Sequence, residues 1–279
     1  MISRRLFVSS AAALSVAPHA AFAASSRVSF SGSMQQASLV IGRAPAGTRV
    51  TVNGTPVSLS ADGTFAFGFE YDQTKATSVA AQLPGGTSEA HDLTPTVRKY
   101  ELQEVNGLPE KTVTPSPEEV ERIHRENAMV ADARKRDSAG VAFAEPFDWP
   151  IAGIISSLFG SQRKLNGELQ APHFGIDIAA NANTPIHAPA DGTVVLAEPD
   201  FFLTGGTTLL DHGHGVFTSY LHQNALRVAV GQAVKRGDVI GLVGMKGRAT
   251  GPHLHWGLNW FQMRLDPSLS ARTPLPAKA

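Results

Sequence analysis

The chain has 279 residues, enough for about two domains, and its 24 Lys and Arg residues balance 24 Asp and Glu residues. A formal net charge of zero excludes the broad basic surface that nucleic-acid binding requires, and a polybasic membrane anchor. Apolar residues make up 42% of the chain, so it can bury a core, and cysteine is absent. Thiol catalysis, thiolate zinc sites and disulfides are therefore excluded, and any metal ion must be held by His, Asp or Glu.

The first 23 residues have the features of an export signal. Arg4 and Arg5 precede an apolar stretch over residues 6–16, and Ala21-Phe22-Ala23 is a small-x-small cleavage site. The stretch is shorter than the ~20 residues that a transmembrane helix needs. The adjacent arginines favour the twin-arginine route, with the ordinary Sec route as the alternative. We therefore expect an exported protein with no membrane anchor once the signal is removed.

Residues 24–98 are predicted to form a small β-sandwich. Short β-rich runs over 38–42 and 49–52 are separated by turns, and Asn53-Gly54 is a strong signal for a two-residue hairpin. Phenylalanine alternates at positions 65, 67 and 69, and the regular spacing of turns is typical of a sandwich. No constellation of chemically active residues occurs here, and His91 reads as a surface residue.

Residues 99–145 are predicted to connect two domains. Ser116-Pro117-Glu118-Glu119 combines a capping serine, a first-turn proline and a capping-box glutamate, so a helix is expected over about 117–137. Charged residues surround its few apolar positions, and His124 is expected to face solvent. The pattern indicates a single amphipathic helix that ties the two domains together.

A second domain is predicted over residues 146–270, followed by a tail at 271–279. Glycine-rich turns alternate with Val, Ile and Leu runs, which favours a mostly antiparallel β domain and makes the chain mainly β. Seven of the ten histidines lie between positions 173 and 255. That clustering is the strongest functional signal in the chain.

Two spacings within the histidine cluster are typical of metal ligands. On an extended strand, residues an even number apart share a face, so His173 pairs with Asp177, and His253 with His255. Adjacent strands would thus offer three histidines and one carboxylate to one cleft, with Ile176, Ile178 and Leu254 facing the core. A catalytic zinc takes three protein ligands and keeps a fourth position for water. His222 is the candidate for a further histidine that moves protons.

The C-terminal segment resembles the M23 family of zinc metallopeptidases, also called the LytM or lysostaphin-like family. The resemblance covers about 146–267, and the matching stretches are Ile155–Gly160, His173–Ala180, Thr184–Val194, Asp211–Gly215, Tyr220–His222, Gly231–Gly241 and Thr250–Trp256. It implies an antiparallel β LytM-type peptidase domain. It also implies one Zn²⁺ per chain held by His173, Asp177 and His255, with His222 and His253 as catalytic histidines.

The resemblance implies a secreted zinc metalloendopeptidase that hydrolyses peptide bonds in peptidoglycan cross-links through a zinc-activated water. His222 and His253 would divide stabilisation of the oxyanion and proton delivery to the leaving amine, in an order that the sequence leaves open. The alternatives are a non-hydrolytic LytM-type regulator of another cell-wall hydrolase and a zinc-dependent binding protein. The export signal indicates a Gram-negative periplasm and a diaminopimelate-type cross-link.

The remaining features of this segment have simpler interpretations. Lys246 and Gln223 depart from the residues that the family often has at these positions, and both could tune the fit of substrate. Tyr220 could line the cleft or pack in the core, and Trp256 could form core or cleft wall. Structural roles are expected for the other histidines of the segment, at positions 187, 212 and 214.

Overall fold

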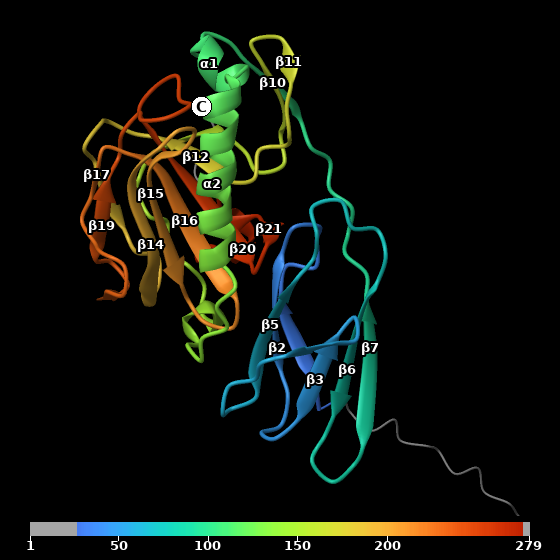
Figure 1. The fold of residues 1–279 in the computed structure, drawn as a ribbon. Coiled ribbons are helices and arrows are strands. Elements are labelled where there is room, and N and C mark those ends of the chain that lie inside the picture. Colours follow the sequence, from blue (N-terminus) through green and yellow to red (C-terminus); the bar gives the residue numbers. More distant parts are fainter. Residues whose placement is uncertain (1–26, 276–279) are drawn as a thin grey trace, which may run out of the picture.

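The computed structural model describes residues 27–275, and its N-terminal part consists of two antiparallel sheets (Figure 1). One sheet has the order β1 (Ser29–Gly32), β2 (Leu39–Arg43), β5 (Thr64–Gly68). The other has the order β4 (Thr55–Val57), β3 (Arg49–Val52), β6 (Thr77–Gln82), β7 (Ser88–Leu93). Asn53 and Gly54 turn between β3 and β4 with φ of 48° and 80°, the positive values that a two-residue hairpin of this type requires.

Strand β5 is buried on both of its faces, which explains its unusual sequence. Phe65, Phe67 and Phe69 point into the core between the two N-terminal sheets and have no exposed surface. Ala66 and Gly68 point the other way, toward the C-terminal part of the chain. A Cβ atom on Gly68 would lie 2.8 Å from side-chain atoms of Leu265 and Met263, so a larger residue here would force these two side chains to move.

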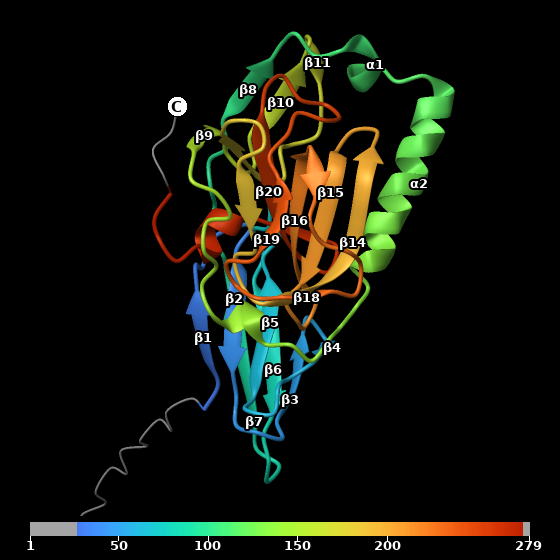
Figure 2. The same cartoon turned by 90° about the vertical axis from the view of Figure 1, so that its left-hand side faces the viewer.

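Further contacts fix the N-terminal sheets to the C-terminal part. Arg98 donates to the buried Asp266 at 2.7 Å, and the rings of Tyr71 and Tyr100 stack with their centres 4.3 Å apart. The Tyr71 hydroxyl donates to the Gly160 carbonyl oxygen at 3.1 Å. The two parts lie end to end (Figures 1 and 2) and share a continuous apolar contact.

The connector contains a strand, two helices and a short 3-10 turn: β8 (Leu102–Val105), α1 (Glu110–Val113), α2 (Pro117–Ala133) and η1 (Ala142–Ala144). The capping box is present at α2, where Ser116 Oγ accepts from Glu119 N–H and the Glu119 carboxylate accepts from Ser116 N–H. The helix ends four residues before the predicted position 137, and none of its residues is buried. Over residues 27–275, no helix has the length and apolar character needed to span a bilayer.

The sequence analysis did not predict β8. This strand pairs in parallel with β10 (Gln162–Leu165), which in turn pairs with β11 (Glu168–Leu169). Its partner lies almost sixty residues further along the chain, so no local pattern indicates the pairing. The connector is therefore more than a tether, because β8 extends a sheet of the C-terminal part.

The main C-terminal sheet has eight strands and confirms the mainly β prediction. Its order is β18 (Ala233–Val234), β14 (Gly192–Phe201), β15 (Gly205–Asp211), β16 (Val216–Gln223), β20 (His253–Trp260), β12 (Ile176–Ala179), β9 (Ile154–Ser157), with β21 (Met263–Leu265) also paired to β20. A smaller sheet joins β13 (Pro185–His187), β19 (Val239–Leu242) and β17 (Ala225–Leu226), and η2 (Pro267–Ser270) follows β21. All pairings in both sheets are antiparallel.

The two faces of the main sheet have different surroundings. Ile176, Ile178, Leu254 and Trp256 are buried in the core, which confirms the predicted core face for the first three. On the opposite face, Val130 of α2 packs against a small apolar cluster on β14, β15 and β16. Figure 1 shows α2 in front of this face, so the open part of the face lies at the end of β12 and β20.

His212 lies in a buried chain of hydrogen bonds between the strands. Its Nδ1 is 2.7 Å from the Asp191 carbonyl oxygen, and its Nε2 is 2.7 Å from Thr218 Oγ1. Thr218 Oγ1 in turn lies 2.7 Å from the Tyr220 hydroxyl. A carbonyl oxygen only accepts, so Nδ1 carries the proton of a neutral ring. Burial lowers the pKa of His212 to about 4.

We expect His212 to make the protein acid-sensitive. Its folded pKa is about 4 against 6.5 for an ordinary histidine, so its contribution to stability is complete above pH 6.5 and is lost as the pH falls toward 4. The shift corresponds to at most about 3 kcal/mol. Urea unfolding at pH 7.5, 6.0 and 5.0 should show a shallower pH dependence for His212→Gln than for the wild type. Parallel curves for the two proteins would contradict this role.

Candidate metal centre

Three predicted ligands converge at the open end of the main sheet. Asp177 on β12 lies directly opposite His255 on β20 in the strand register, and opposite residues share a face. Asp177 Oδ1 is 2.9 Å from His255 Nδ1 and 3.0 Å from His173 Nε2, and the two histidine nitrogens are 2.9 Å apart. His173 and Asp177 are buried, while His255 keeps some exposure.

The route by which His173 reaches the site differs from the prediction. The sequence analysis placed His173 and Asp177 on one strand, but β12 begins only at Ile176 and His173 lies in the preceding loop. The His173 carbonyl oxygen accepts from Gly160 N–H at 2.7 Å, and its own N–H donates to Ser161 at 2.9 Å. His173 is therefore positioned by hydrogen bonds within this loop, and not by the alternation of side chains along a strand.

The donor set fits a divalent cation. The Leu158 carbonyl oxygen lies 3.1 Å from His173 Nδ1, so this nitrogen carries the proton and Nε2 presents a lone pair to the centre of the cluster. Burial lowers the pKa of His255 to about 4, which keeps the imidazole in the neutral form that binds metals. Burial alone would raise the pKa of Asp177, but the adjacent imidazoles of His173 and His255 outweigh it and hold that pKa well below its usual value.

Arg163 holds the second oxygen of Asp177. Its Nη2 lies 2.6 Å from Asp177 Oδ2 and 3.0 Å from Ser157 Oγ, and Ser157 donates to Gln103 Oε1 at 2.6 Å. Oδ1 thus faces the histidines while Oδ2 is occupied by a guanidinium. The sequence analysis missed Arg163 and Gln103, because both lie on strands whose pairing is not apparent from local patterns.

His222 and His253 lie against this cluster. The ring centres of His222 and His253 are 4.7 Å apart, and that of His222 is 6.2 Å from that of His255. His222 Nδ1 is 2.8 Å from the Lys246 carbonyl oxygen, and His253 Nδ1 is 2.8 Å from the Gly251 carbonyl oxygen. Both Nδ1 atoms therefore carry protons, which leaves Nε2 of each ring as the atom that can exchange one.

His222 adopts a backbone conformation that is rare outside glycine. Its φ is +64°, and the pairing of β15 with β16 shifts register just before it. Strand alternation would place Tyr220 and His222 on the same face. The observed bulge instead leaves Tyr220 fully buried in the core and brings the His222 ring to His253. Burial lowers the pKa of His222 to about 3, so this ring is neutral.

Gln223 and Lys246, the two residues that depart from the family pattern, lie in different environments. Gln223 is fully buried and donates to Thr208 Oγ1 and the Tyr220 carbonyl oxygen, each at 2.9 Å. Lys246 accepts from His222 through its backbone, while its Nζ is 3.3 Å from the Pro199 carbonyl oxygen. Gln223 thus packs in the sheet, and the backbone of Lys246 orients the His222 ring.

The other histidines of this segment lie outside the cluster, as predicted. His187 Nδ1 is 2.8 Å from the Gly237 carbonyl oxygen, and His212 and His214 are buried beside Phe147 and Phe143. Within residues 27–275, the group that could hold a metal ion consists of His173, Asp177 and His255. Trp256 is fully buried, so it belongs to the core and not to the wall of the cleft.

The family comparison places a peptidase domain on this site. Residues 171–267 match Peptidase family M23. The chain is 43% identical over 88 residues to the peptidoglycan DD-endopeptidase ShyA of Vibrio cholerae, which covers 32% of this chain and 20% of that protein. It is 41% identical over 122 residues to the DD-carboxypeptidase/endopeptidase Mpg of Neisseria meningitidis, which covers 44% of this chain and 28% of that protein. The chain thus spans less than a third of the length of these two relatives.

A crystal structure from Pseudomonas aeruginosa assigned to peptidase M23 has a similar fold over a longer range. The two chains superpose with a TM-score of 0.66 at 29% identity, over 85% of this chain and 94% of that chain. The likeness extends beyond residues 171–267, so it includes elements outside the matched domain.

We expect metal to stabilise the folded protein through the His173 cluster. Binding at 1,000 times the dissociation constant contributes about 4 kcal/mol, which corresponds to a shift in Tm on the order of 10 °C. Thermal unfolding with and without a chelator should show this shift in the wild type and in His187→Ala. His173→Ala should show almost none. An equal chelator effect in His173→Ala and the wild type would place the metal elsewhere.

Proposed function

Because the chain belongs to peptidase family M23 through residues 171–267, we propose that it is a zinc metallopeptidase that hydrolyses peptide bonds in peptidoglycan. The observation that carries this proposal is the convergence of His173, Asp177 and His255 with two further histidines placed against them. The printed names of ShyA and Mpg support a peptidoglycan substrate. They favour an endopeptidase that acts on cross-links. We propose a diaminopimelate-type cross-link as the specific bond, because the predicted export signal indicates a Gram-negative periplasm.

Nε2 of His173, Oδ1 of Asp177 and Nδ1 of His255 would hold one zinc ion. When bound, Zn²⁺ supplies a Lewis acid that polarises the scissile carbonyl group and lowers the pKa of water. Arg163 keeps Asp177 Oδ2 occupied, so the carboxylate offers Oδ1 alone to the ion. The ligand set would carry one negative charge, because histidines bind a metal ion as neutral imidazoles.

His222 and His253 would divide the proton transfers. Nδ1 of each ring donates to a backbone carbonyl oxygen, so Nε2 is the atom of each ring that can exchange a proton. One ring accepts a proton from the attacking water, whose OH adds to the carbonyl carbon, and passes that proton to the nitrogen of the leaving amine. The C–N bond then breaks to give a carboxylic acid and an amine, and the remaining proton of the acid passes to the amine or to solvent. The other ring, once protonated, donates to the oxyanion.

The alternative is a non-hydrolytic regulator of another cell-wall hydrolase. That function needs no intact ligand set, whereas here all three ligands and both accessory histidines are present and lie together. Hydrolysis of cell-wall peptides requires export, which agrees with the signal predicted in the first 23 residues, outside the described range. We therefore propose a periplasmic enzyme.

We expect His253→Ala to abolish most activity without loss of metal. Removing a proton-transferring histidine costs roughly 10²–10⁴-fold in rate. Purified peptidoglycan should be incubated with residues 24–279 of the wild type, His253→Ala and His173→Ala, and the released fragments identified by mass spectrometry. His253→Ala should retain zinc and lose activity, whereas His173→Ala should lose both.

His124→Ala is a matched control, because His124 is exposed on α2 and does not belong to the cluster of His173, Asp177 and His255. It should cleave at the wild-type rate. A wild-type protein that holds zinc and releases no fragments would refute hydrolysis and favour the regulator. Full activity in His253→Ala would remove that residue from the mechanism.

A further inference from the structure

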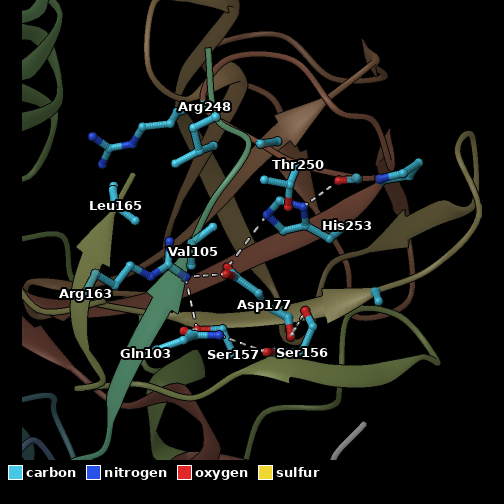
Figure 3. Close-up of a pocket in the computed structure, with 15 residues that line it drawn as sticks. Gln103, Val105, Ser156, Ser157, Arg163, Leu165, Asp177, Arg248, Thr250 and His253 are labelled. Atoms are coloured by element: carbon cyan, nitrogen blue, oxygen red, sulfur yellow. Dashed lines mark hydrogen bonds and ion pairs between the residues drawn. The ribbon is translucent and has the colours of Figure 1, made fainter. Parts of the chain in front are cut away.

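A cavity of about 220 Å³ opens directly beside the candidate metal centre (Figure 3). Asp177 and His253 form one side of it. The other sides come from four separate segments, which are β8, β9, β10 and the loop over residues 248–252. Whatever occupies the cavity therefore lies next to the bond that the histidines would cleave.

Two arginines line this cavity and are incompletely paired. Arg163 Nη2 binds Asp177 and Ser157, but its Nε is buried and has no hydrogen-bond partner among the described residues. Arg248 makes one side-chain hydrogen bond within residues 27–275, from Nη1 to the Thr112 carbonyl oxygen at 3.3 Å. No carboxylate of that range lies within 4 Å of its guanidinium group, as an ion pair requires.

The charges in the cavity do not balance. Asp177 is the one acidic residue among the described residues that line it, and its two oxygens are already engaged by the histidines and by Arg163. Burial, and then the charge of Arg163, lowers the pKa of Arg248 below its usual value, so the two guanidinium groups repel each other. A divalent cation on the ligand set would make the cavity still more positive. Partly buried cations without counter-ions are costly unless a ligand supplies the negative charge.

The rest of the lining fits a carboxylate on an aliphatic stem. Val105, Leu108 and Leu165 provide an apolar wall, and Ser156 and Thr250 provide hydroxyl groups. A guanidinium binds a carboxylate through two parallel N–H donors, which gives both charge compensation and a defined orientation. In Figure 3 the guanidinium groups of Arg163 and Arg248 lie on the same side of the cavity, away from His253.

We propose that this cavity is a carboxylate-binding subsite, in which Arg163 and Arg248 hold a carboxylate of the substrate peptide on a residue adjacent to the scissile bond. This inference rests on the proposed function and narrows it to anionic peptides. Two sources supply the same chemistry. One is the free C-terminal carboxylate of an uncross-linked peptide, and the other is a carboxylate on an internal residue at a cross-link.

Arg248 is the residue that tests the proposal. Arg163 touches Asp177, so its substitution would also disturb the metal centre. Arg248→Gln removes the charge, Arg248→Lys keeps it without the planar fork, and Arg125→Gln removes an exposed arginine of α2 as the control. Zinc content and Tm of each variant establish that the fold and the metal centre are retained. If Arg248→Gln does not fold, the comparison of free and amidated peptides on the wild type still tests the subsite.

The first measurement compares peptides with free and amidated carboxylates. Synthetic cross-linked peptides and uncross-linked peptides ending in D-alanine should each be prepared with the carboxylate next to the scissile bond free or converted to the amide. The wild type and Arg125→Gln should show kcat/KM about 100-fold higher for the free carboxylate in one of the two series, which identifies its source. Arg248→Gln should reduce that ratio to near one, mainly through KM, and Arg248→Lys should give an intermediate ratio.

The second measurement does not depend on catalysis. The metal-free protein should be titrated calorimetrically with the stem tetrapeptide ending in D-alanine. Arg248→Gln should bind this peptide with a Kd at least 10-fold weaker than the wild type does. The wild type should in turn bind the fully amidated tetrapeptide at least 10-fold more weakly than the free one. Equal cleavage of free and amidated peptides by the wild type would overturn the subsite and leave the peptidase function standing. Absence of all cleavage, together with Arg248-dependent binding, would refute the peptidase function and support the subsite. Binding that is indifferent to both Arg248 and amidation would overturn the subsite.

Discussion

The pairing of Asp177 with His255 across β12 and β20 is the constraint on which the site depends. Their side chains meet because Ile176, Ile178, Leu254 and Trp256 occupy the opposite face and are buried in the core. A slip of one residue would turn these apolar side chains toward the cleft and the ligands toward the core. The apolar packing on one face of the sheet therefore fixes the candidate metal ligands on the other.

His222 is the one site residue that breaks this alternation, and the sheet accommodates it in a specific way. Its positive φ and the register shift of β16 allow Tyr220 to remain in the core, where its hydroxyl continues the hydrogen-bond chain from His212 through Thr218. A residue other than glycine keeps a positive φ only where the surrounding contacts hold its backbone in that conformation. Here the Lys246 carbonyl oxygen holds the His222 ring on one side.

Local sequence patterns predicted the features that depend on local physics. The hairpin at Asn53-Gly54, the capping box at Ser116 and the alternation around Leu254 each follow from backbone preferences or burial over a few residues. Patterns failed where distant segments meet. Strand β8 pairs with β10, the strand that carries Arg163, sixty residues further along the chain, and Arg248 joins the same cavity from a still more distant loop. The loop that carries His173 depends on hydrogen bonds to Gly160 and Ser161, which no periodic pattern indicates. The bulge at His222 escaped prediction because histidine is not a residue that signals positive φ.

The connector contributes to the candidate site, and β8 and α2 do so unequally. Strand β8 is held by the ladder with β10, by Gln103 on Ser157 and by the paired hydrogen bonds between Leu108 and Asn166. Helix α2, in contrast, buries none of its residues and touches the sheet mainly through Val130 and a few polar contacts. Because Ser157 also bonds to Arg163, the position of Gln103 is coupled through three hydrogen bonds to the carboxylate of Asp177. A domain cut at residue 146 would keep every predicted ligand and Arg163, yet it would lose the side of the cavity that Gln103, Val105 and Leu108 form, and the hydrogen bond between Ser157 and Gln103. The lining of the cavity therefore begins at β8, well before the segment in which the family resemblance is found.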